Sequence, residues 1–526
     1  MAETDHWCRL PGYEDLVTQC KYINATTNCD LFAKTLALPN ETVSSACGTK
    51  WKFSSCLRYD VNTTDVIDLM NTHDNHTWKT MNCGDKMEYD TSQYTSTAVQ
   101  EFGFVCDRYY LGPLSTTILL VGPFLANIFM GQLADRIGRR PTLMINITIF
   151  VVFGALQSVI RTTVVFFICN FMVGIAMFGM YSQVFVFVSE IVGPSKRGSM
   201  TMACVVFYSL GFTVLPLIAF FIRDWSILVL VISVSAAALL SYWWLLSESP
   251  RWLLSVGKVE QAKKVLQKMA KVNKVILPES VFEDLNKEKC VLKNVHSEDK
   301  HEFTGKVTTG IEQAYLLSRT NLTDPRPTCL RAGSSLSLLY YGLTFNVGNL
   351  GGNNYTNALI AGAVEIVAYS SSMYLVETRC GRKLTICISS MIAAIATVSS
   401  AFISQCGGTL WVMVAVYMVG KFAATVGYAV SQLYAGELFP TTLRSVGVMS
   451  TSSCSILASS LAPLLLPLRM TWNPLPQLVF GGLSIMSAFL VLTLPETRRR
   501  KLPANINEAE MFEKKLPSCE TMTKEL

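Results

Sequence analysis

The sequence predicts an all-α protein that crosses a membrane many times, and three observations support this fold class. Half of the 526 residues are hydrophobic, only 16% are charged and the mean hydropathy is +0.35. Eleven apolar runs are each about 18 residues long or longer, the length that a membrane helix needs. Arginine and lysine gather in alternate loops, which is typical of a polytopic membrane protein. Eleven buried helices of a soluble protein would need more amphipathic faces than these runs show.

The apolar runs form two groups, five before a long polar stretch and six after it. The expected spans are 109–133, 142–160, 163–188, 200–222 and 226–247, then 332–349, 355–376, 384–404, 409–436, 446–467 and 475–495. They divide the chain into an extracellular loop domain (1–108), an N-terminal transmembrane bundle (109–254), a cytoplasmic linker (255–330), a C-terminal transmembrane bundle (331–497) and a cytoplasmic tail (498–526). Within the linker, the spacing of apolar residues over 259–272 predicts a lysine-rich helix that lies against the inner membrane surface.

The charges of the loops predict the orientation in the membrane. One alternate set of short loops holds nine basic residues: Arg136, Arg139, Arg140, Lys196, Arg197, Arg379, Arg382, Lys383 and Arg444. The intervening loops hold only Arg161, Arg223 and Arg469. Because positive residues remain on the cytoplasmic side, the first set and the C-terminal tail are expected inside and the N-terminal domain outside.

Cysteines and glycosylation motifs independently place the first 108 residues outside the cell. Seven of the sixteen cysteines lie there: Cys8, Cys20, Cys29, Cys47, Cys56, Cys83 and Cys106. Four N-x-[ST] motifs, at Asn24, Asn40, Asn62 and Asn75, are the expected glycosylation sites. Disulfides persist in oxidising compartments, so these cysteines are disulfide candidates. Seven is an odd number, and one thiol is therefore expected to be free or to pair elsewhere.

Three landmarks recur at nearly one spacing and predict two homologous halves. Arg136 and Arg379 are 243 residues apart, Glu190 and Glu437 are 247 apart, and Glu248 and Glu496 are 248 apart. Transporters often use such repeats to build a central site between two bundles. The first half has five spans against six, and no apolar signal sequence follows Met1. We therefore expect that one span before the extracellular domain is absent from this sequence.

Several motifs resemble those of the major facilitator superfamily and, within it, the organic cation, carnitine and organic anion transporter family of animals. The resemblance runs from DHWC (5–8) to PETR (495–498). GQLADRIGRR (131–140) is similar to the superfamily's turn between its second and third spans. The remaining landmarks are EFGFVCDR (101–108), SESPRWLL (247–254), GNNYTNALIAGAVE (352–365) and ELFPTTLRSVGVM (437–449). Sugar porters share the SESPRWLL element but lack the long cysteine-rich loop, and rank second.

The family resemblance implies twelve spans in two pseudo-symmetric bundles and a conformational latch in the charged turns. Such a latch forms its ion pairs in one state of the transport cycle and breaks them in the other. Asp135 could accept hydrogen bonds at the amide end of a neighbouring helix, and the arginines could pair with Glu190. The expected latch residues are Gly131, Asp135, Arg136, Gly138, Arg139, Arg140, Glu190, Arg197, Glu248 and Arg251, and then Arg379, Gly381, Arg382, Glu437, Arg444, Glu496 and Arg498. Isolated residues such as Lys196 have the alternative role of setting topology alone.

Two ionisable residues lie deep within spans, where charge is costly and usually functional: Glu365 and Lys421. Glu365 could face an organic cation, or the two could form a structural ion pair. By the resemblance, five tyrosines line the central cavity, and aromatic faces attract ammonium groups by about 0.5–2 kcal/mol each. These are Tyr181, Tyr208, Tyr340, Tyr341 and Tyr355, for each of which simple packing is the alternative.

Gln432 and Ile456 complete the expected substrate site. Gln432 is a possible polar contact one span away from the tyrosines. Ile456 occupies the position at which, by the resemblance, cation carriers have an aspartate and carriers of anions or zwitterions have an arginine. Because this position is uncharged here, the sign of the substrate depends on Glu365 and Lys421.

The sequence therefore predicts a plasma-membrane carrier of small organic ions, with organic cations or amine zwitterions favoured. The alternatives are an organic anion carrier, a sugar-porter-like carrier, and a transport-inactive short form that acts as a binding or regulatory partner and forms homo-oligomers through the extracellular domain. No nucleotide-binding loop, nucleophile–base arrangement or metal-spaced cluster is present, so we expect no enzyme activity, cofactor or metal. A net charge of +6 gives no case for nucleic acid.

Overall fold

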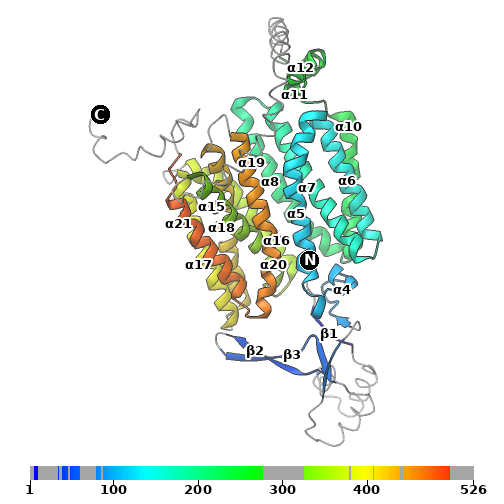
Figure 1. The fold of residues 1–526 in the computed structure, drawn as a ribbon, viewed down its shortest axis with the longest axis vertical. Coiled ribbons are helices and arrows are strands. Elements are labelled where there is room, and N and C mark those ends of the chain that lie inside the picture. The colour runs from blue at the N-terminus through cyan, green and yellow to red at the C-terminus, as the bar shows by residue number, and fades with distance from the viewer. Residues whose placement is uncertain are drawn as a thin grey trace, which may run out of the picture.

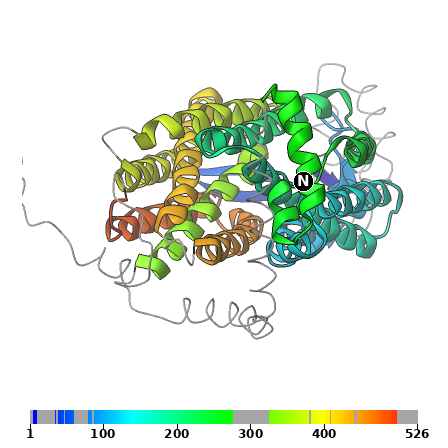
Figure 2. The same ribbon diagram turned by 90° about the horizontal axis from the view of Figure 1, so that it is seen from above.

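A computed structural model describes residues 5–9, 34, 38–45, 48–59, 79–83, 87–275, 325–377, 381–406, 408–438 and 444–497. Two helix bundles lie side by side, with the strands of the N-terminal domain at one end and the short helices that follow the first bundle at the other (Figure 1). Below, these two ends are called extracellular and cytoplasmic after the orientation that the loop charges predict. Figure 2, seen along the bundles, shows the first half beside the second half. This arrangement confirms the predicted fold of two helical halves.

The N-terminal bundle contains five spans. They are α5 (Leu111–Ile137), α6 (Arg139–Val159), α7 (Thr163–Ile191), α8 (Pro194–Phe221) and α9 (Trp225–Ala237), the last continued by η2 (Ala238–Ser241) and α10 (Tyr242–Leu245). Local chemistry fixes several of the ends. The Asp224 carboxylate caps α9 by accepting hydrogen bonds from the backbone N–H groups of Ser226 and Ile227. Pro194 begins α8, where its missing N–H donor costs nothing.

The C-terminal bundle contains six helices of spanning length. They are α15 (Pro325–Asn346, followed by η4, Val347–Asn349), α16 (Asn354–Glu377), α17 (Gly381–Gln405), α18 (Leu410–Leu438), α19 (Arg444–Ser460, extended by α20, Ala462–Leu465, and η5, Leu466–Met470) and α21 (Leu475–Leu492). Among the described residues, ten helices are long and apolar enough to cross a membrane. The eleventh expected span, 332–349, lies in α15, which packs in the same bundle against α18, α19 and α21. Its serines and basic N-terminal turn make it less apolar than the others.

The two halves meet along two helix pairs, α8 with α16 and α5 with α19. At the first contact the Gly362 backbone lies against Thr213, and a Cβ on this glycine would come within 2.5 Å of the Thr213 hydroxyl oxygen. At the second, the Asn127 amide donates hydrogen bonds to the Met449 carbonyl (3.3 Å) and the Ser453 hydroxyl (2.8 Å). Close approach of small residues is the usual way in which membrane helices associate.

In its described residues, the extracellular domain contains three antiparallel two-stranded sheets. β1 (His6–Cys8) pairs with β6 (Met87–Tyr89), β2 (Asn40–Ser45) with β3 (Gly48–Phe53), and β4 (Leu57–Tyr59) with β5 (Thr80–Asn82). Disulfides join Cys8 to Cys83 and Cys56 to Cys106. Cys20, Cys29 and Cys47 lie outside the described residues, as do the glycosylation candidates Asn24, Asn62 and Asn75. Cys406, after α17, is also disulfide-bonded, with a partner outside the described residues.

A short segment of this domain contacts both halves. The Thr95 N–H donates to the Arg223 carbonyl, and the Trp225 N–H donates to the Ser96 carbonyl, so the segment pairs with the α8–α9 loop. The Gln93 side chain donates to the Gly352 carbonyl before α16. The extracellular domain therefore bridges the ends of the two bundles, through backbone hydrogen bonds to the first half and through the Gln93 side chain to the second.

α11 (Pro250–Ser255) ends the first half, and α12 (Val259–Asn273) lies in the linker. The predicted helix over 259–272 is confirmed, and Val259 and Ala262 form its buried face. Its Lys264 side chain is on the exposed face. Figure 1 shows both helices beyond the end of the first bundle.

Gly174 allows α5 and α7 to touch, and we predict that Gly174→Val destabilises the protein. A Cβ at this position would overlap the Leu119 carbonyl oxygen and approach Pro123. Overpacking of this kind costs about 1–3 kcal/mol, so the thermal unfolding temperature of the purified protein should fall. Gly211→Ala is the control, since nothing lies within 4 Å of a Cβ there. Equal unfolding temperatures for the two variants would contradict the packing described here.

Candidate functional site

The cytoplasmic turn of the first half is built around Gly138 and Glu248. Gly138 has a φ of 109°, which lets α5 end and α6 begin without a connecting loop. The Glu248 carboxylate accepts hydrogen bonds from the N–H groups of Arg139 (3.0 Å) and Arg140 (3.3 Å). A Cβ on Gly138 would overlap this carboxylate. Glu248 therefore places a negative charge on the positive end of α6, where it is most stabilising.

Arg139 forms ion pairs with two acidic residues at this turn. Its guanidinium forms ion pairs with Glu190 (3.0 Å) and Asp135 (2.9 Å), and it donates to the Ala134 carbonyl (3.0 Å). The side chains of Arg139 and Glu190 are only 13% and 15% exposed, whereas that of Asp135 is 66% exposed. Since solvent screens exposed pairs, the contact with Glu190 is the stronger of the two.

The second half repeats this construction. Gly381 has a φ of 67°, and the Glu496 carboxylate accepts from the N–H groups of Arg382 (3.1 Å) and Lys383 (3.0 Å) at the start of α17. The Arg382 guanidinium pairs with Glu437 (2.9 Å). Two turns far apart in sequence thus share three features: a glycine with a positive φ, a carboxylate that caps a helix N-terminus and a half-buried arginine–glutamate pair.

The turns differ from the sequence-based expectation in one respect. The acid at the amide end of the neighbouring helix is Glu248, not Asp135, because Asp135 points to Arg139 and to solvent. Sequence spacing could not show this, since Glu248 is 109 residues from the helix that it caps. Within the described residues, the ion pairs of these turns each join residues of one half.

The other expected latch residues have more varied surroundings. Arg140 lies over the Trp243 ring (4.5 Å) and donates to the Trp243 carbonyl. Gly131 faces the Met449 side chain, while Arg136 and Arg251 are exposed. Arg197 lies in the first turn of α8, and Arg444 is the first residue of α19. Arg379 and Arg498 lie outside the described residues.

A cluster of tyrosines lies on spans of both halves, away from the helix ends. Tyr181 of α7 and Tyr208 of α8 are in edge contact (ring centroids 5.9 Å apart), and Tyr340 and Tyr341 of α15 likewise (5.1 Å). The Tyr341 side chain of the second half is a neighbour of both Tyr181 and Tyr208 of the first half. The structure adds Tyr428, whose ring stacks on Tyr340 (4.8 Å, 8°). We call Tyr181, Tyr208, Tyr340, Tyr341 and Tyr428 the tyrosine cluster.

Tyr428 and one further tyrosine, Tyr369, were missed by the sequence analysis, although a signal was present. Tyr428 follows Lys421 by seven residues, and Tyr369 follows Glu365 by four, so each shares a helix face with a buried charge. Tyr369 is a hydrogen-bond partner of Tyr340. The helical spacing from the intramembrane charges would have found both.

The buried charges Glu365 and Lys421 form one ion pair beside the tyrosine cluster. The Lys421 Nζ lies 2.6 Å from the Glu365 Oε1, and the side chains are 0% and 1% exposed. Tyr340 donates its hydroxyl proton to the same carboxylate oxygen (2.9 Å), and Lys421 also donates to the Thr344 hydroxyl. Lys421 lies 4.3 Å from the centroid of the Tyr340 ring. The structure therefore shows the ion pair, one of the two alternatives from the sequence, and places it beside the aromatic cluster.

Tyr355 does not belong to this cluster. It lies at the extracellular end, where its hydroxyl donates to the Gln93 carbonyl (3.0 Å) and its ring contacts Tyr94 (5.2 Å). Ile456 is buried (8% exposed) on α19, and Gln432 is half-buried on α18. No hydrogen bond within the described residues joins Gln432 to the tyrosines.

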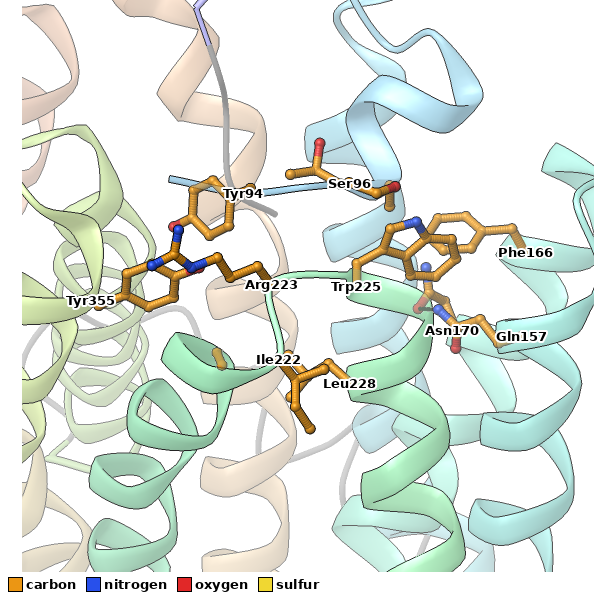
Figure 3. A pocket seen from close by; sticks show the side chains of 13 residues that line it. Tyr94, Ser96, Gln157, Phe166, Asn170, Ile222, Arg223, Trp225, Leu228 and Tyr355 are labelled. Atoms are coloured by element: carbon orange, nitrogen blue, oxygen red, sulfur yellow. Dashed lines mark hydrogen bonds between the residues drawn. The ribbon is translucent and has the colours of Figure 1, made fainter. Parts of the chain in front are cut away.

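Tyr355 instead lines a pocket beneath the extracellular domain (Figure 3). Figure 3 shows Tyr94, Tyr355 and Arg223 on one side of it, and Trp225 and Phe166 on the other. The pocket is also lined by residues of α7, α8 and α9 of the first half, and it is separate from the tyrosine cluster.

His6, Cys56 and Cys106 lie close together in the extracellular domain, with potential ligand atoms within 4.8 Å of one another. The sulfur atoms of Cys56 and Cys106 are joined in a disulfide, however. A disulfide sulfur lacks the thiolate charge with which cysteine binds metals, so this group does not form a metal centre.

Comparison with known proteins identifies the family. The family described as "Sugar (and other) transporter" matches residues 66–505. An organic cation transporter protein of Drosophila melanogaster is 33% identical over 466 residues, covering 89% of this chain and 83% of the relative. The chain belongs to the organic cation and carnitine transporter family. Organic cation/carnitine transporter 2 of Mus musculus is 31% identical, covering 81% of this chain and 74% of the relative.

The fold of this family member is that of the major facilitator superfamily. The inward-open xylose transporter XylE from E. coli aligns with a TM-score of 0.58 at 18% identity, covering 76% of this chain and 89% of XylE. The protein is therefore a membrane transporter of small organic solutes. The predicted family, the fold class and this general function are confirmed.

We predict that the acid capping α6 contributes more to stability than the exposed acid before it. Glu248→Ala leaves two N–H groups at a helix terminus without their charged acceptor, a loss of about 1–2 kcal/mol. Asp135→Ala, its matched control, removes a mostly exposed partner of Arg139 and should change stability by about 0–1 kcal/mol. Thermal unfolding of the purified variants measures both. A larger effect of Asp135→Ala would show that the cap is assigned to the wrong acid.

Proposed function

We propose that the protein carries small organic cations or amine zwitterions across the plasma membrane by alternating access. The tyrosine cluster is the binding site, since Tyr181 and Tyr208 come from one half and Tyr340 and Tyr341 from the other. A ligand between them would contact both bundles, and could be released to either side as the bundles rock. The extracellular domain faces outward and the charged turns face the cytoplasm, in keeping with the loop charges.

The single observation that carries the cation preference is the position of Lys421. Its ammonium group already lies 4.3 Å from the Tyr340 ring centroid and 2.6 Å from the Glu365 carboxylate. The site thus holds an ammonium ion of its own, using the aromatic face and carboxylate that an organic cation would use. The names of the relatives agree with a preference for cations, because carnitine carries a quaternary ammonium group.

A tracer panel tests the substrate class in cells that express the protein. Tetraethylammonium and carnitine should enter and benzoate should not. Tyr181→Leu should raise the KM for tetraethylammonium by about 2- to 30-fold, the equivalent of one cation–π contact. Tyr181→Phe keeps the ring and should keep the KM. Uptake of benzoate alone would favour the anion carrier, and failure of every tracer would favour a transport-inactive partner protein.

We also propose that the paired turns act as the cytoplasmic latch of this cycle. In each half a half-buried arginine–glutamate pair, Arg139–Glu190 or Arg382–Glu437, fixes the end of one span against another. Each pair joins two spans of one half, so a pair with little solvent screening can bias the balance between the two states by holding those cytoplasmic ends in one arrangement. Their repetition in both halves supports a shared role.

Glu190→Gln should change the transport rate by about 2- to 5-fold with little change in KM, since an ion pair of this kind contributes up to about 1 kcal/mol. Glu260→Gln, on the exposed face of α12, is the control and should transport normally. Maximal tracer uptake is measured per molecule at the cell surface. An unchanged rate in Glu190→Gln would argue against the latch.

A further inference from the structure

The pocket beneath the extracellular domain has walls from both halves of the protein (Figure 3). Its volume is about 290 Å³, near the lower end of the range for sites that hold small molecules. Tyr355 comes from α16 of the second half, whereas Arg223 and Trp225 come from the first half. Tyr94 belongs to the segment that bridges the two. A ligand in this pocket would therefore contact both halves and the extracellular domain.

Arg223 gives the pocket a positive charge that no acid of the described structure balances. It is the single charged side chain among the described residues that line the pocket, and it forms no ion pair with any of the residues that the structure describes. The two nearby acids are engaged elsewhere. Glu101 accepts from the Arg161 guanidinium (2.6 Å) and the Trp225 indole N–H (2.8 Å), and Asp224 caps α9. The pocket therefore favours an anion, and a carboxylate matches the paired N–H donors of a guanidinium.

A second donor lies on the other side of the pocket, on a buried amide. Asn170 and Gln157 are 8% and 7% exposed, and the Gln157 amide donates to the Asn170 Oδ1 (3.0 Å). No described residue accepts a hydrogen bond from the Asn170 amide nitrogen. Figure 3 shows the two amides beneath Trp225 and Phe166. A buried donor without an acceptor is costly, so a ligand oxygen that accepts from Asn170 would be stabilised here.

Flat aromatic side chains form the walls between these two donors. The Tyr94 and Tyr355 rings lie 5.2 Å apart beside Arg223, and the Phe166 and Trp225 rings meet edge to face at 5.8 Å on the other side. Such walls favour a planar, apolar ligand body. The charge, the second donor and the walls together describe an aromatic ring with a carboxylate at one end and a hydrogen-bond acceptor at the other.

We propose that this pocket binds a small aromatic carboxylate from the extracellular side, at a site separate from the tyrosine cluster. The carboxylate pairs with Arg223, the ring lies between the aromatic walls, and an oxygen opposite the carboxylate accepts from Asn170. Because the ligand contacts Tyr355 of one half and Arg223 of the other, it favours the arrangement in which their extracellular ends are joined. It therefore slows cation uptake without being carried. This effect on uptake rests on the proposed function, whereas the binding does not.

Equilibrium binding of radiolabelled 4-hydroxybenzoate to the purified full chain in nanodiscs tests the site. The wild type should bind it saturably, and Arg223→Gln should weaken binding about tenfold, the equivalent of one charge-assisted hydrogen bond. Arg223 is exposed, so this variant should keep its fold. Arg108→Gln changes an exposed arginine at the same end that does not line the pocket, and should bind as the wild type. No saturable binding, or equal binding by wild type and Arg223→Gln, overturns the proposal.

The second donor is tested with benzoate, which lacks the oxygen opposite the carboxylate. In the wild type, benzoate should bind more weakly than 4-hydroxybenzoate. In Asn170→Leu the two should bind equally, because the donor that distinguishes them is gone. A preference for 4-hydroxybenzoate that persists in Asn170→Leu shows that this amide does not contact the ligand, and overturns the assigned binding mode.

Competition and uptake separate this site from the tyrosine cluster. Raising tetraethylammonium should move the apparent Kd of 4-hydroxybenzoate to a limiting value at most. An apparent Kd that rises in proportion to tetraethylammonium shows one shared site and overturns the proposal. In cells, external 4-hydroxybenzoate should lower the maximal rate of tetraethylammonium uptake by the wild type and have little effect on Arg223→Gln. Equal inhibition of both overturns the coupling between the halves. Absence of all uptake overturns the proposed function and leaves the binding result standing.

Discussion

The bilayer's inability to solvate charge is the constraint on which this structure depends. Backbone groups must bond within helices, and intramembrane charges must be paired. Lys421 and Glu365 meet this demand at 2.6 Å, with both side chains buried. The ion pair thus supplies within the protein the charge balance that the bilayer cannot provide.

The cytoplasmic turns also pair polar groups that would otherwise lack partners, here at the helix ends. A helix that begins there exposes N–H groups, and the carboxylates of Glu248 and Glu496 accept from them in the two halves. Each also lies close against a glycine of positive φ, so the turn and the cap require each other. The arginine beside each cap then has a half-buried glutamate as its partner. This repetition supports a common role at the ends that move during transport.

The two halves differ where the extracellular domain meets them. Residues 93–96 join the α8–α9 loop of the first half to the start of α16 in the second. The pocket lined by Tyr94 and Tyr355 lies beside this segment. Pseudo-symmetry thus explains the paired turns and helices, while the extracellular segment adds a connection that has no counterpart on the cytoplasmic side of the described structure.

The sequence alone determined the helical spans, the two-fold repeat, the family and the two charges that lie deep within spans. These follow from hydropathy, loop charge and spacing, which are properties of short segments. Only the tertiary structure decided that Glu248 rather than Asp135 caps α6, that Lys421 pairs with Glu365, that Tyr428 joins the tyrosine cluster, and that Tyr355 lies outside it. Each of these depends on how helices distant in the chain pack. Spacing along one helix defines which face a residue occupies, but contacts across the bundle define what that face meets.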